Sequence, residues 1–377
     1  MEKQLSVAIL GCGRMGNTII EQIEDLPEVK RIVGYDPSDA QLTKTKTSHP
    51  QVEVTTDLET VLNDSEIQLV YIAASNANHV PLAVKALRAG KAVMSEKPSG
   101  ISYEQVEELL QVQKETGGFV QVGLECRYSW AYLEAKKAIQ SGEIGQLKNV
   151  HFTYSQGAYS KNITLPNGDV IPNWRVFKSG SGSMVLEKLC HYIDLVRWWN
   201  EGSKVDKFIL TNAENVIPYF EIEDNVHVSY HFDNGCVSHL YFISTAAALD
   251  ERGGNVDLFD QDKMGYKLNY VLTGTEGAIE IDVFQREIRF YHHTGKPGQE
   301  KAAIVRKLSW DKDFGKENGQ SESLWFHNTY EQNRDIVRRV LNGLPPSISL
   351  EDAQESMRLC LDFAAAAENQ SWEVIHR

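Results

Sequence analysis

Cysteine is scarce in this chain, and no pair of cysteines has the spacing of a metal or redox site. The five cysteines are scattered over 377 residues without a Cys-x-x-Cys motif: Cys12, Cys126, Cys190, Cys236 and Cys360. An odd number of scattered cysteines is typical of reduced thiols rather than of a disulfide framework or a structural zinc site. We therefore expect ordinary thiols here.

Long apolar runs and a secretory leader are also missing. No apolar run approaches the ~20 residues that a membrane-spanning helix needs. The first residues, Met1 to Leu5, pass directly into a strand-like run and leave no room for a signal peptide. These absences lead us to expect a cytoplasmic protein without a membrane partner.

Basic charge is in deficit, because 38 lysines and arginines face 52 aspartates and glutamates, for a net charge of −14. Binding to a nucleic acid or an anionic membrane needs a clustered basic surface, and the sequence contains no such cluster. We therefore expect a small-molecule ligand and no nucleic-acid partner. The length predicts two domains, and we find no internal repeat or low-complexity segment.

A glycine-rich turn follows the first apolar run. The run Val7–Leu10 has the pattern of a strand, and Gly11-Cys12-Gly13-Arg14-Met15-Gly16 comes directly after it. In a phosphate-binding turn the first glycine allows the tight turn, the second lets the backbone approach a pyrophosphate, and the third lets the helix pack on the strand. The helix N-terminus then presents amide groups and a positive dipole end to the phosphates. A purely steric reason for the glycines remains the alternative.

Asp36 lies 20 residues beyond Gly16, at the end of a second apolar run. A carboxylate at this point accepts hydrogen bonds from the adenosine ribose hydroxyls and repels a 2′-phosphate, so the sequence favours NAD over NADP. The alternative is an acidic residue that caps a turn before Pro37.

Alternating strand and helix patterns predict a parallel sheet wrapped by helices up to about Val122. The expected strands are Val7–Leu10, Ile32–Tyr35, Val52–Thr55, Leu69–Ala73, Ala92–Ser95 and Phe119–Val122, and the expected helices are Asn17–Leu26, Leu58–Leu62, Pro81–Ala89 and Tyr103–Thr116. We assign residues 1–124 to a dinucleotide-binding domain.

The remainder, residues 125–377, predicts an α+β domain with a large open, mainly antiparallel sheet. After about Val150 we expect a loop-rich section, a helix at Met184–Trp199, and then alternating strands. Those strands are Val205–Thr211, Asn225–Phe232, Cys236–Ser244, Lys267–Thr273, Ala278–Val283 and Glu287–His292. Two helices, Ser323–Leu341 and Leu350–Asn369, close the chain and are candidates to pack back on the first domain.

Glu96-Lys97-Pro98 follows a buried-looking strand, which places Lys97 at the carboxyl end of the sheet, where such folds bind ligands. A lysine near a cationic nicotinamide ring loses its proton more readily, and its amine can hydrogen-bond a reacting hydroxyl. The alternative is a loop lysine whose head lies in water.

Glu187, His191 and Asp194 are spaced four and three residues apart, which puts them on one face of the expected helix. Histidine titrates near neutral pH and suits acid–base chemistry, and a carboxylate one turn away can orient its ring. The same set could ligate a metal, but such a site usually wants a second histidine, so we expect no metal. A structural, hydrogen-bonded histidine is the other alternative.

Three further loops carry candidate ligand-binding residues. Ser75, Asn76 and His79 follow the fourth strand, Arg127 follows the sixth, and the loop before the second-domain helix contains Trp174-Arg175. An indole offers a flat wall and an arginine a fixed cation against a sugar, although loop tryptophans more often simply pack. Turn residues that bond their own backbone are the alternative for the first loop.

Taken together these motifs resemble the glucose-fructose oxidoreductase / inositol dehydrogenase family, called Gfo/Idh/MocA. The resemblance covers nearly the whole chain and rests on the glycine turn, Ser75-Asn76 to His79, Ala89-Gly90-Lys91 before Glu96-Lys97-Pro98, Arg127-Tyr128, Gly142-Glu143-Ile144-Gly145, Trp174-Arg175, and His191 to Asp194. It implies a Rossmann domain, a second domain whose open sheet makes a homo-oligomer (a dimer or tetramer), and NAD(P)-linked oxidation or reduction of sugars or inositol-like cyclitols.

The resemblance also implies roles for individual residues. Lys97 matches the family's catalytic lysine and His191 its catalytic histidine, while Glu187 stands where the family commonly has an aspartate. The cofactor-binding set is Gly11, Gly13, Arg14, Met15, Gly16, Asp36, Ser75, Asn76, His79, Glu96 and Lys97. The substrate-binding set is Lys97, Arg127, Tyr154, Trp174, Arg175, Glu187 and His191. Lys188 and Cys190 also depart from the commoner small residues.

Two other functions stay open beside a dehydrogenase. Some proteins of this family are redox-neutral glycosidases, which oxidise a sugar transiently, eliminate the aglycone and reduce the ring again. Others sense a dinucleotide or sugar without catalysis, a reading that the presence of Lys97 and His191 disfavours.

Overall fold

The computed structural model describes residues 3–165, 168–245, 267–294, 301–310, 325–369 and 375–376. The chain forms two compact units. The first unit comprises Met1–Glu125, Asn162–Cys190 and Thr329–Leu361, and the second comprises Cys126–Lys161, His191–Asn328 and Asp362–Arg377. Residues 162–190 and 329–361 thus pack with the N-terminal residues that we expected in the dinucleotide-binding domain. In the described residues no helix is both long and apolar enough to cross a membrane.

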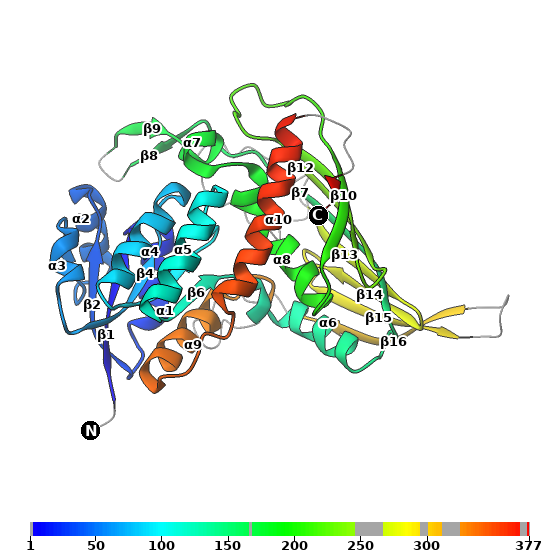
Figure 1. Cartoon of the computed structure of the whole chain (residues 1–377), viewed down its shortest axis with the longest axis horizontal. Coiled ribbons are helices and arrows are strands. Elements are labelled where there is room, and N and C mark those ends of the chain that lie inside the picture. Colours follow the sequence, from blue (N-terminus) through cyan, green and yellow to red (C-terminus); the bar gives the residue numbers. More distant parts are fainter. Residues whose placement is uncertain are drawn as a thin grey trace. The chain divides into compact units, whose positions relative to one another are not determined.

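The first unit is built on a parallel sheet with the strand order β3-β2-β1-β4-β5-β6 (Figure 1). Its strands are β1 Leu5–Leu10, β2 Val29–Tyr35, β3 Glu53–Thr55, β4 Ile67–Ile72, β5 Ala92–Glu96 and β6 Val120–Gly123. All six residues of β1 are buried, as expected of a central strand covered on both faces. The order reverses next to β1, and ligands bind at such a switch point, beyond the carboxyl ends of the strands. This arrangement confirms the expected Rossmann domain.

Helices connect and cover these strands. They are α1 Arg14–Ile23, α2 Asp39–Ser48, α3 Leu58–Leu62, α4 His79–Arg88 and α5 Tyr103–Thr116, joined later in the chain by α9 Thr329–Asn342 and the first part of α10 Leu350–Asn369. Side chains of Ser38, Asp57 and Ser102 accept hydrogen bonds from first-turn amides and cap α2, α3 and α5. On one face of the sheet, isoleucines of α1 pack with Ile336 and Val337 of α9 in one apolar core.

Residues 162–190 add smaller elements to the first unit. A hairpin pairs β8 Asn162–Thr164 with β9 Val170–Pro172, and 3₁₀ turn η3 Trp174–Val176, helix α7 Lys178–Ser181 and the π-helical turn η4 Val185–Leu189 follow. A second 3₁₀ turn, η1 Asn76–Asn78, precedes α4. The sequence pattern predicted one continuous helix at Met184–Trp199, whereas the structure begins it with a π turn.

The second unit is dominated by a nine-stranded sheet, counted over the described residues, with the order β16-β15-β14-β13-β7-β12-β11-β10-β17 (Figure 1). The strands are β7 Leu147–Gly157, β10 Val205–Thr211, β11 Asn225–Phe232, β12 Val237–Thr245, β13 Lys267–Gly274, β14 Gly277–Asp282, β15 Glu287–Thr294, β16 Lys301–Ser309 and β17 Ile375–His376. Only the β7–β12 pair is parallel among these described strands, which confirms the mainly antiparallel sheet.

One face of this sheet carries an aromatic core. Phe152, Tyr192 and Tyr270 have ring centroids within 4.8 to 6.4 Å of one another. Tyr192 comes from helix α8 Cys190–Trp199, and helix α6 Trp130–Gln140 adds Tyr132. Burial of these large rings removes apolar surface from water and so stabilises the unit.

The expected loop-rich section after Val150 is wrong at its start, because β7 is a central strand of the second sheet. Helices α2 and α6 and strand β16 were also absent from the expected elements. Val150, Phe152 and Tyr154 of β7 are buried and alternate with more exposed residues, so β7 carries a strand signal that the prediction missed. The expected helix at Ser323–Leu341 begins at Thr329, and residues 323–324 lie outside the described part.

Candidate functional site

The three glycines of the turn after β1 differ in what surrounds them. Gly11 has φ of 102°, and a Cβ there would lie 2.7 Å from the carbonyl oxygen of Ala73. A Cβ at Gly16 would lie 1.9 Å from the carbonyl oxygen of Gly11, so both positions require glycine for protein packing alone. Gly13 differs, because a Cβ there would meet nothing within 4 Å. The open space beside Gly13 and the first turn of α1, which lacks acidic residues, fit a bound phosphate group.

Asp36 is held in place by the same turn. One carboxylate oxygen accepts from the Cys12 amide at 2.9 Å, and the other accepts from the Ser38 amide at 2.9 Å. Each carboxylate oxygen has a second lone pair that a ribose hydroxyl can use. Burial and the nearby Asp36 charge raise the pKa of the Cys12 thiol to about 12, so Cys12 is a neutral packing group.

Lys97 follows β5 at the carboxyl end of the parallel sheet. Its Nζ donates to the backbone carbonyl oxygen of Glu187 at 2.8 Å and lies 3.4 Å from the Glu187 carboxylate oxygen Oε2. Glu187 lies in the π turn η4, and such turns are frequent at functional sites because they alter the helical hydrogen-bond pattern. The Lys97 ammonium is therefore fixed by two oxygens of one residue.

The Glu187 carboxylate is buried among cations. Arg175 Nε donates to Oε1 at 3.0 Å, and Asn76 Nδ2 lies 3.5 Å from Oε2. Burial opposes ionisation, but the charges of Lys97, Arg175 and Lys188 outweigh it and lower the pKa of Glu187 to about 2. Glu187 is therefore ionised throughout the physiological range. The guanidinium of Arg175 also lies over the Trp174 ring, 4.4 Å from its centroid.

His79 joins two loops rather than pointing to solvent. Its Nδ1 lies 2.9 Å from the Pro98 carbonyl oxygen and its Nε2 lies 3.0 Å from the Ala74 carbonyl oxygen. Burial lowers the pKa of His79. In the neighbouring turn, Asn76 also donates to the Ser181 carbonyl oxygen at 3.2 Å, and Ser75 Oγ accepts from Asn78 Nδ2 at 2.8 Å. His79 thus ties together the loops that follow β4 and β5.

Glu96 directly precedes Lys97 in the sequence, and its side chain is buried in a different environment. Burial, and then the charge of Glu125, raise the pKa of Glu96 to about 8. Its Oε1 has no hydrogen-bond partner within the described residues, and a Cβ at Gly123 would lie 3.1 Å from its Oε2. Glu96 is therefore a buried carboxyl that keeps its proton at neutral pH.

The second unit holds His191 and its neighbours. His191 stands in the first turn of α8, and Asp194 one turn later accepts two hydrogen bonds from Arg127, at 2.8 Å from Nε and 2.6 Å from Nη2. This bidentate pair is almost completely buried. The His191 ring also lies 4.9 Å from the ring of His327, measured between centroids. No sequence spacing pointed to His327, because 136 residues separate it from His191.

Tyr154 lies in the core of the second unit. Its hydroxyl donates to Gln156 Oε1 at 2.9 Å, and its ring contacts those of Phe152, Tyr192 and Phe242. With 6% of its surface exposed, Tyr154 is a packing residue in this structure.

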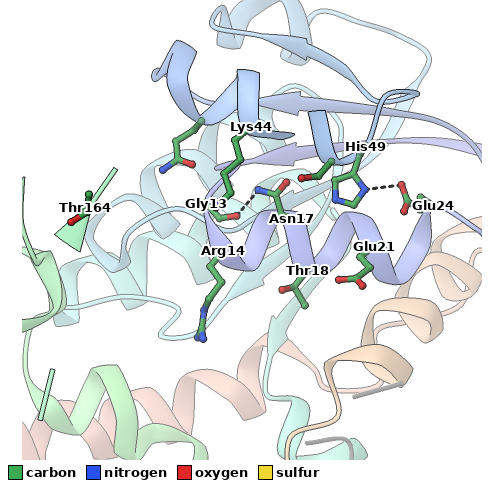
Figure 2. Close-up of a pocket in the computed structure, with 11 residues that line it drawn as sticks. Gly13, Arg14, Asn17, Thr18, Glu21, Glu24, Lys44, His49 and Thr164 are labelled. Carbon is green, nitrogen blue, oxygen red and sulfur yellow. Dashed lines mark hydrogen bonds and ion pairs between the residues drawn. The ribbon is translucent and has the colours of Figure 1, made fainter. Parts of the chain in front are cut away.

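A cavity of about 740 Å³ opens beside the glycine turn (Figure 2). It is lined by one side of α1 along its length, by α2 and the residue after it, and by β8, through Gly13, Arg14, Asn17, Thr18, Glu21, Glu24, Gln41, Lys44, Ser48, His49 and Thr164. Of the expected cofactor residues it includes Gly13 and Arg14, so it reaches the phosphate end of the expected dinucleotide site.

Comparison with known proteins identifies the family. Residues 5–124 match the family model described as "Oxidoreductase family, NAD-binding Rossmann fold", and residues 132–280 match the GFO/IDH/MocA C-terminal domain. The chain belongs to the Gfo/Idh/MocA family. It is an oxidoreductase whose cofactor is NAD.

Curated relatives and solved structures agree with this assignment. The scyllo-inositol 2-dehydrogenase (NAD(+)) of Bacillus subtilis (strain 168) is 27% identical over 292 residues, which is 76% of each chain. The uncharacterized oxidoreductase YrbE of the same strain is 26% identical over 285 residues, 75% of each. Levoglucosan dehydrogenase in complex with NADH and levoglucosan has the same fold, with a TM-score of 0.76, 19% identity and full coverage of both chains.

Proposed function

We propose that this protein oxidises a secondary hydroxyl of a sugar, a sugar derivative or an inositol-like cyclitol, with NAD as the hydride acceptor. The contact between Lys97 and Glu187 carries the proposal, because it fixes a cation at the ligand-binding edge of the sheet. The name of the B. subtilis relative, a scyllo-inositol 2-dehydrogenase, supports a cyclitol or sugar as the substrate class.

Lys97 serves to orient the reacting hydroxyl. An ammonium held by the Glu187 carbonyl and carboxylate donates a hydrogen bond to the substrate oxygen and stabilises negative charge that develops there. Glu187 keeps its own charge and so balances the cations of Lys97 and Arg175 while the substrate is absent.

His191 serves as the general base. Its imidazole takes the hydroxyl proton while the hydrogen on the same carbon leaves as hydride, and the two electrons go with the hydride. When bound, NAD accepts that hydride at its nicotinamide ring. The buried Arg127–Asp194 pair fixes the helix turn that follows His191.

The remaining parts of the proposal concern cofactor, assembly and location. Asp36 selects NAD over NADP because its carboxylate repels a 2′-phosphate. The open sheet of the second unit joins copies of the chain into a homo-oligomer. The protein works in the cytoplasm on a small-molecule substrate, and its net charge of −14 disfavours a nucleic-acid partner.

A panel of inositols, aldoses, anhydrosugars and glycosides tests the proposal, with NADH absorbance as the readout. We expect NADH to form with at least one cyclitol or sugar. Release of an aglycone without net NADH would replace the dehydrogenase with the redox-neutral glycosidase. Tight NAD binding without conversion of any compound would favour a sensor.

A further inference from the structure

Three metal-ligating side chains converge in the second unit. The sulfur of Cys126 and one ring nitrogen each of His191 and His327 lie within 4.8 Å of one another. Cys126 and His191 are buried, and His327 is half-buried. The sequence argued against a metal here because the helix offers a single histidine, but the fold adds a second histidine and a thiol. Cysteine sulfur and histidine nitrogen are both usual ligands of Zn²⁺, so one thiolate and two imidazoles can hold this ion, with water completing its coordination.

Hydrogen bonds outside the three ligands hold them in this arrangement. Cys126 and Tyr128 lie in the 3₁₀ turn η2 Glu125–Tyr128, and the segment before α9 is fastened to this region. The Asn328 amide donates to Ser129 Oγ at 3.0 Å, and Asn328 Nδ2 donates to the Tyr128 carbonyl oxygen at 3.0 Å. The Cys126 sulfur lies 3.6 Å from the Phe326 carbonyl oxygen. His327 is therefore anchored by its neighbours on both sides next to Cys126.

We propose that Cys126, His191 and His327 form a Zn²⁺ site whose occupation inhibits the enzyme. Binding forms one bond from zinc to the Cys126 sulfur and one to a nitrogen of each histidine, displaces water from the ion, and releases the thiol proton to solvent. A zinc-bound nitrogen of His191 has no lone pair left to accept a proton. The inhibitory effect rests on the proposed role of His191 as base, whereas the metal site itself does not.

Inhibition of NADH formation tests the functional half of the proposal. The chelator-treated enzyme is assayed over a micromolar series of ZnSO₄, with a substrate found in the panel above. We expect Zn²⁺ to inhibit the wild type reversibly, with EDTA restoring the rate. Cys126→Ser and His327→Asn should keep the metal-free rate and need at least about tenfold more Zn²⁺ for half-inhibition. Cys236→Ser, which alters another buried thiol of the same unit, should behave as the wild type.

Cobalt spectroscopy tests the site without any turnover. Co²⁺ added to the metal-free wild type should produce a thiolate-to-cobalt charge-transfer band, which Cys236→Ser retains and Cys126→Ser loses. His327→Asn should weaken Co²⁺ binding and provides a second variant if Cys126→Ser does not fold. Absence of the band in the wild type, or equal inhibition of all four proteins by Zn²⁺, would overturn the proposal. A normal band in a protein that converts no substrate would uphold the metal site and reject the proposed function.

Discussion

Two buried glutamates of the first unit have opposite pKa shifts, and their neighbours explain the difference. Glu187 faces Lys97 and Arg175 at 3.4 and 3.0 Å, so the nearby cations overcome the cost of burial. Glu96 is equally shielded from water, but the charge of Glu125 adds to the effect of burial. Lys97 therefore has two different carboxyl neighbours. Glu187 is ionised and contacts the Lys97 ammonium, whereas Glu96 is protonated and precedes Lys97 in the sequence.

The stability of the protein should reveal the raised pKa of Glu96. The folded carboxyl keeps its proton up to about pH 8, whereas the unfolded one loses it near its ordinary 4.5. The contribution of the protonated Glu96 carboxyl to the free energy of unfolding is therefore fully present below pH 4.5 and is lost as the pH rises through 8. Between pH 5 and 8 we expect the free energy of unfolding of the wild type to fall by about 3 kcal/mol more than that of Glu96→Gln. Denaturant unfolding at both pH values measures this, with the exposed Glu59→Gln as control, and parallel pH dependence of all three proteins would refute the raised pKa.

Asp36 should determine the choice between the two nicotinamide dinucleotides. Asp36→Ala removes the carboxylate that repels a 2′-phosphate, so we expect the ratio of NAD to NADP affinity to fall. Isothermal titration with both dinucleotides measures the ratio. Circular dichroism checks the fold, because the amides of Cys12 and Ser38 lose their acceptor. An unchanged ratio would mean that Asp36 does not contact the ribose.

The glycines at the junction of β1 and α1 have different roles. Some are needed for packing, and one has open space beside it. Alanine at Gly16 would collide with the backbone of Gly11, and relief requires the whole helix to shift. Alanine at Gly13 fits, because its φ of −71° is ordinary and the space beside it is open. The same motif thus contains two glycines that packing requires, Gly11 and Gly16, and one, Gly13, that leaves space for a ligand.

We expect Gly16→Ala to destabilise the protein by about 2 kcal/mol. Gly13→Ala should change stability by less than about 0.5 kcal/mol and weaken NAD binding by about tenfold. Thermal unfolding and NAD titration of both variants measure the contrast. Normal NAD affinity in Gly13→Ala would mean that the pyrophosphate does not bind beside Gly13.

Local patterns predicted many elements, and the missed ones have identifiable causes. The bounds of α3, α5, β10, β11 and α10 coincide with the expected ranges, because each has clear caps, turns or alternation. Helix α2 was missed because its sequence, Asp39–Ser48, has only two buried residues, Leu42 and Thr45, and so no apolar stripe. The π turn at Val185–Leu189 carries no sequence signal at all, since periodicity does not distinguish it from the helix that follows.

At the scale of the whole molecule, the sequence predicted the two kinds of sheet but not which distant segments would meet. The family resemblance placed Lys97, Arg175 and Glu187 in one substrate-binding set, and the fold adds the contacts that the Glu187 carboxylate makes with the other two. Cys126 and His327 were missed because 201 residues separate these two side chains, which lie together in the fold. The roles given to Lys97 and His191 came from their positions in the sequence and from the family resemblance, and they stay predictions until turnover is measured.

The open face of the second sheet should carry the contact between copies of the chain. Val271 lies opposite His151 on β7, which in turn lies opposite His239 on β12, so these three side chains share one face. Val271 is 37% exposed, and so is Tyr241 at 40% on the same face, whereas the alternate residues Phe152 and Tyr270 are buried. Such exposed apolar residues in mid-sheet are typical of an interface.

We expect sedimentation velocity to show a dimer or tetramer for the wild type and a shift toward monomer for Val271→Glu. The carboxylate introduced at position 271 would be buried without a cation at the centre of the contact, and this would weaken the association of the copies. Val216→Glu is the control, because Val216 is 68% exposed in the loop between β10 and β11, off the sheet face. A monomeric wild type, or an unchanged oligomer in Val271→Glu, would contradict this face as the interface.

The rate of NADH formation by Lys97→Ala and His191→Ala, measured beside NAD affinity, tests the central claim most directly. Each variant should lose about 10²–10⁴ in turnover on the substrate of the wild type while binding NAD nearly as well, because the lost groups act on the reacting hydroxyl. Near-normal turnover in either variant would contradict the role assigned to that residue, and near-normal turnover in both would contradict the account.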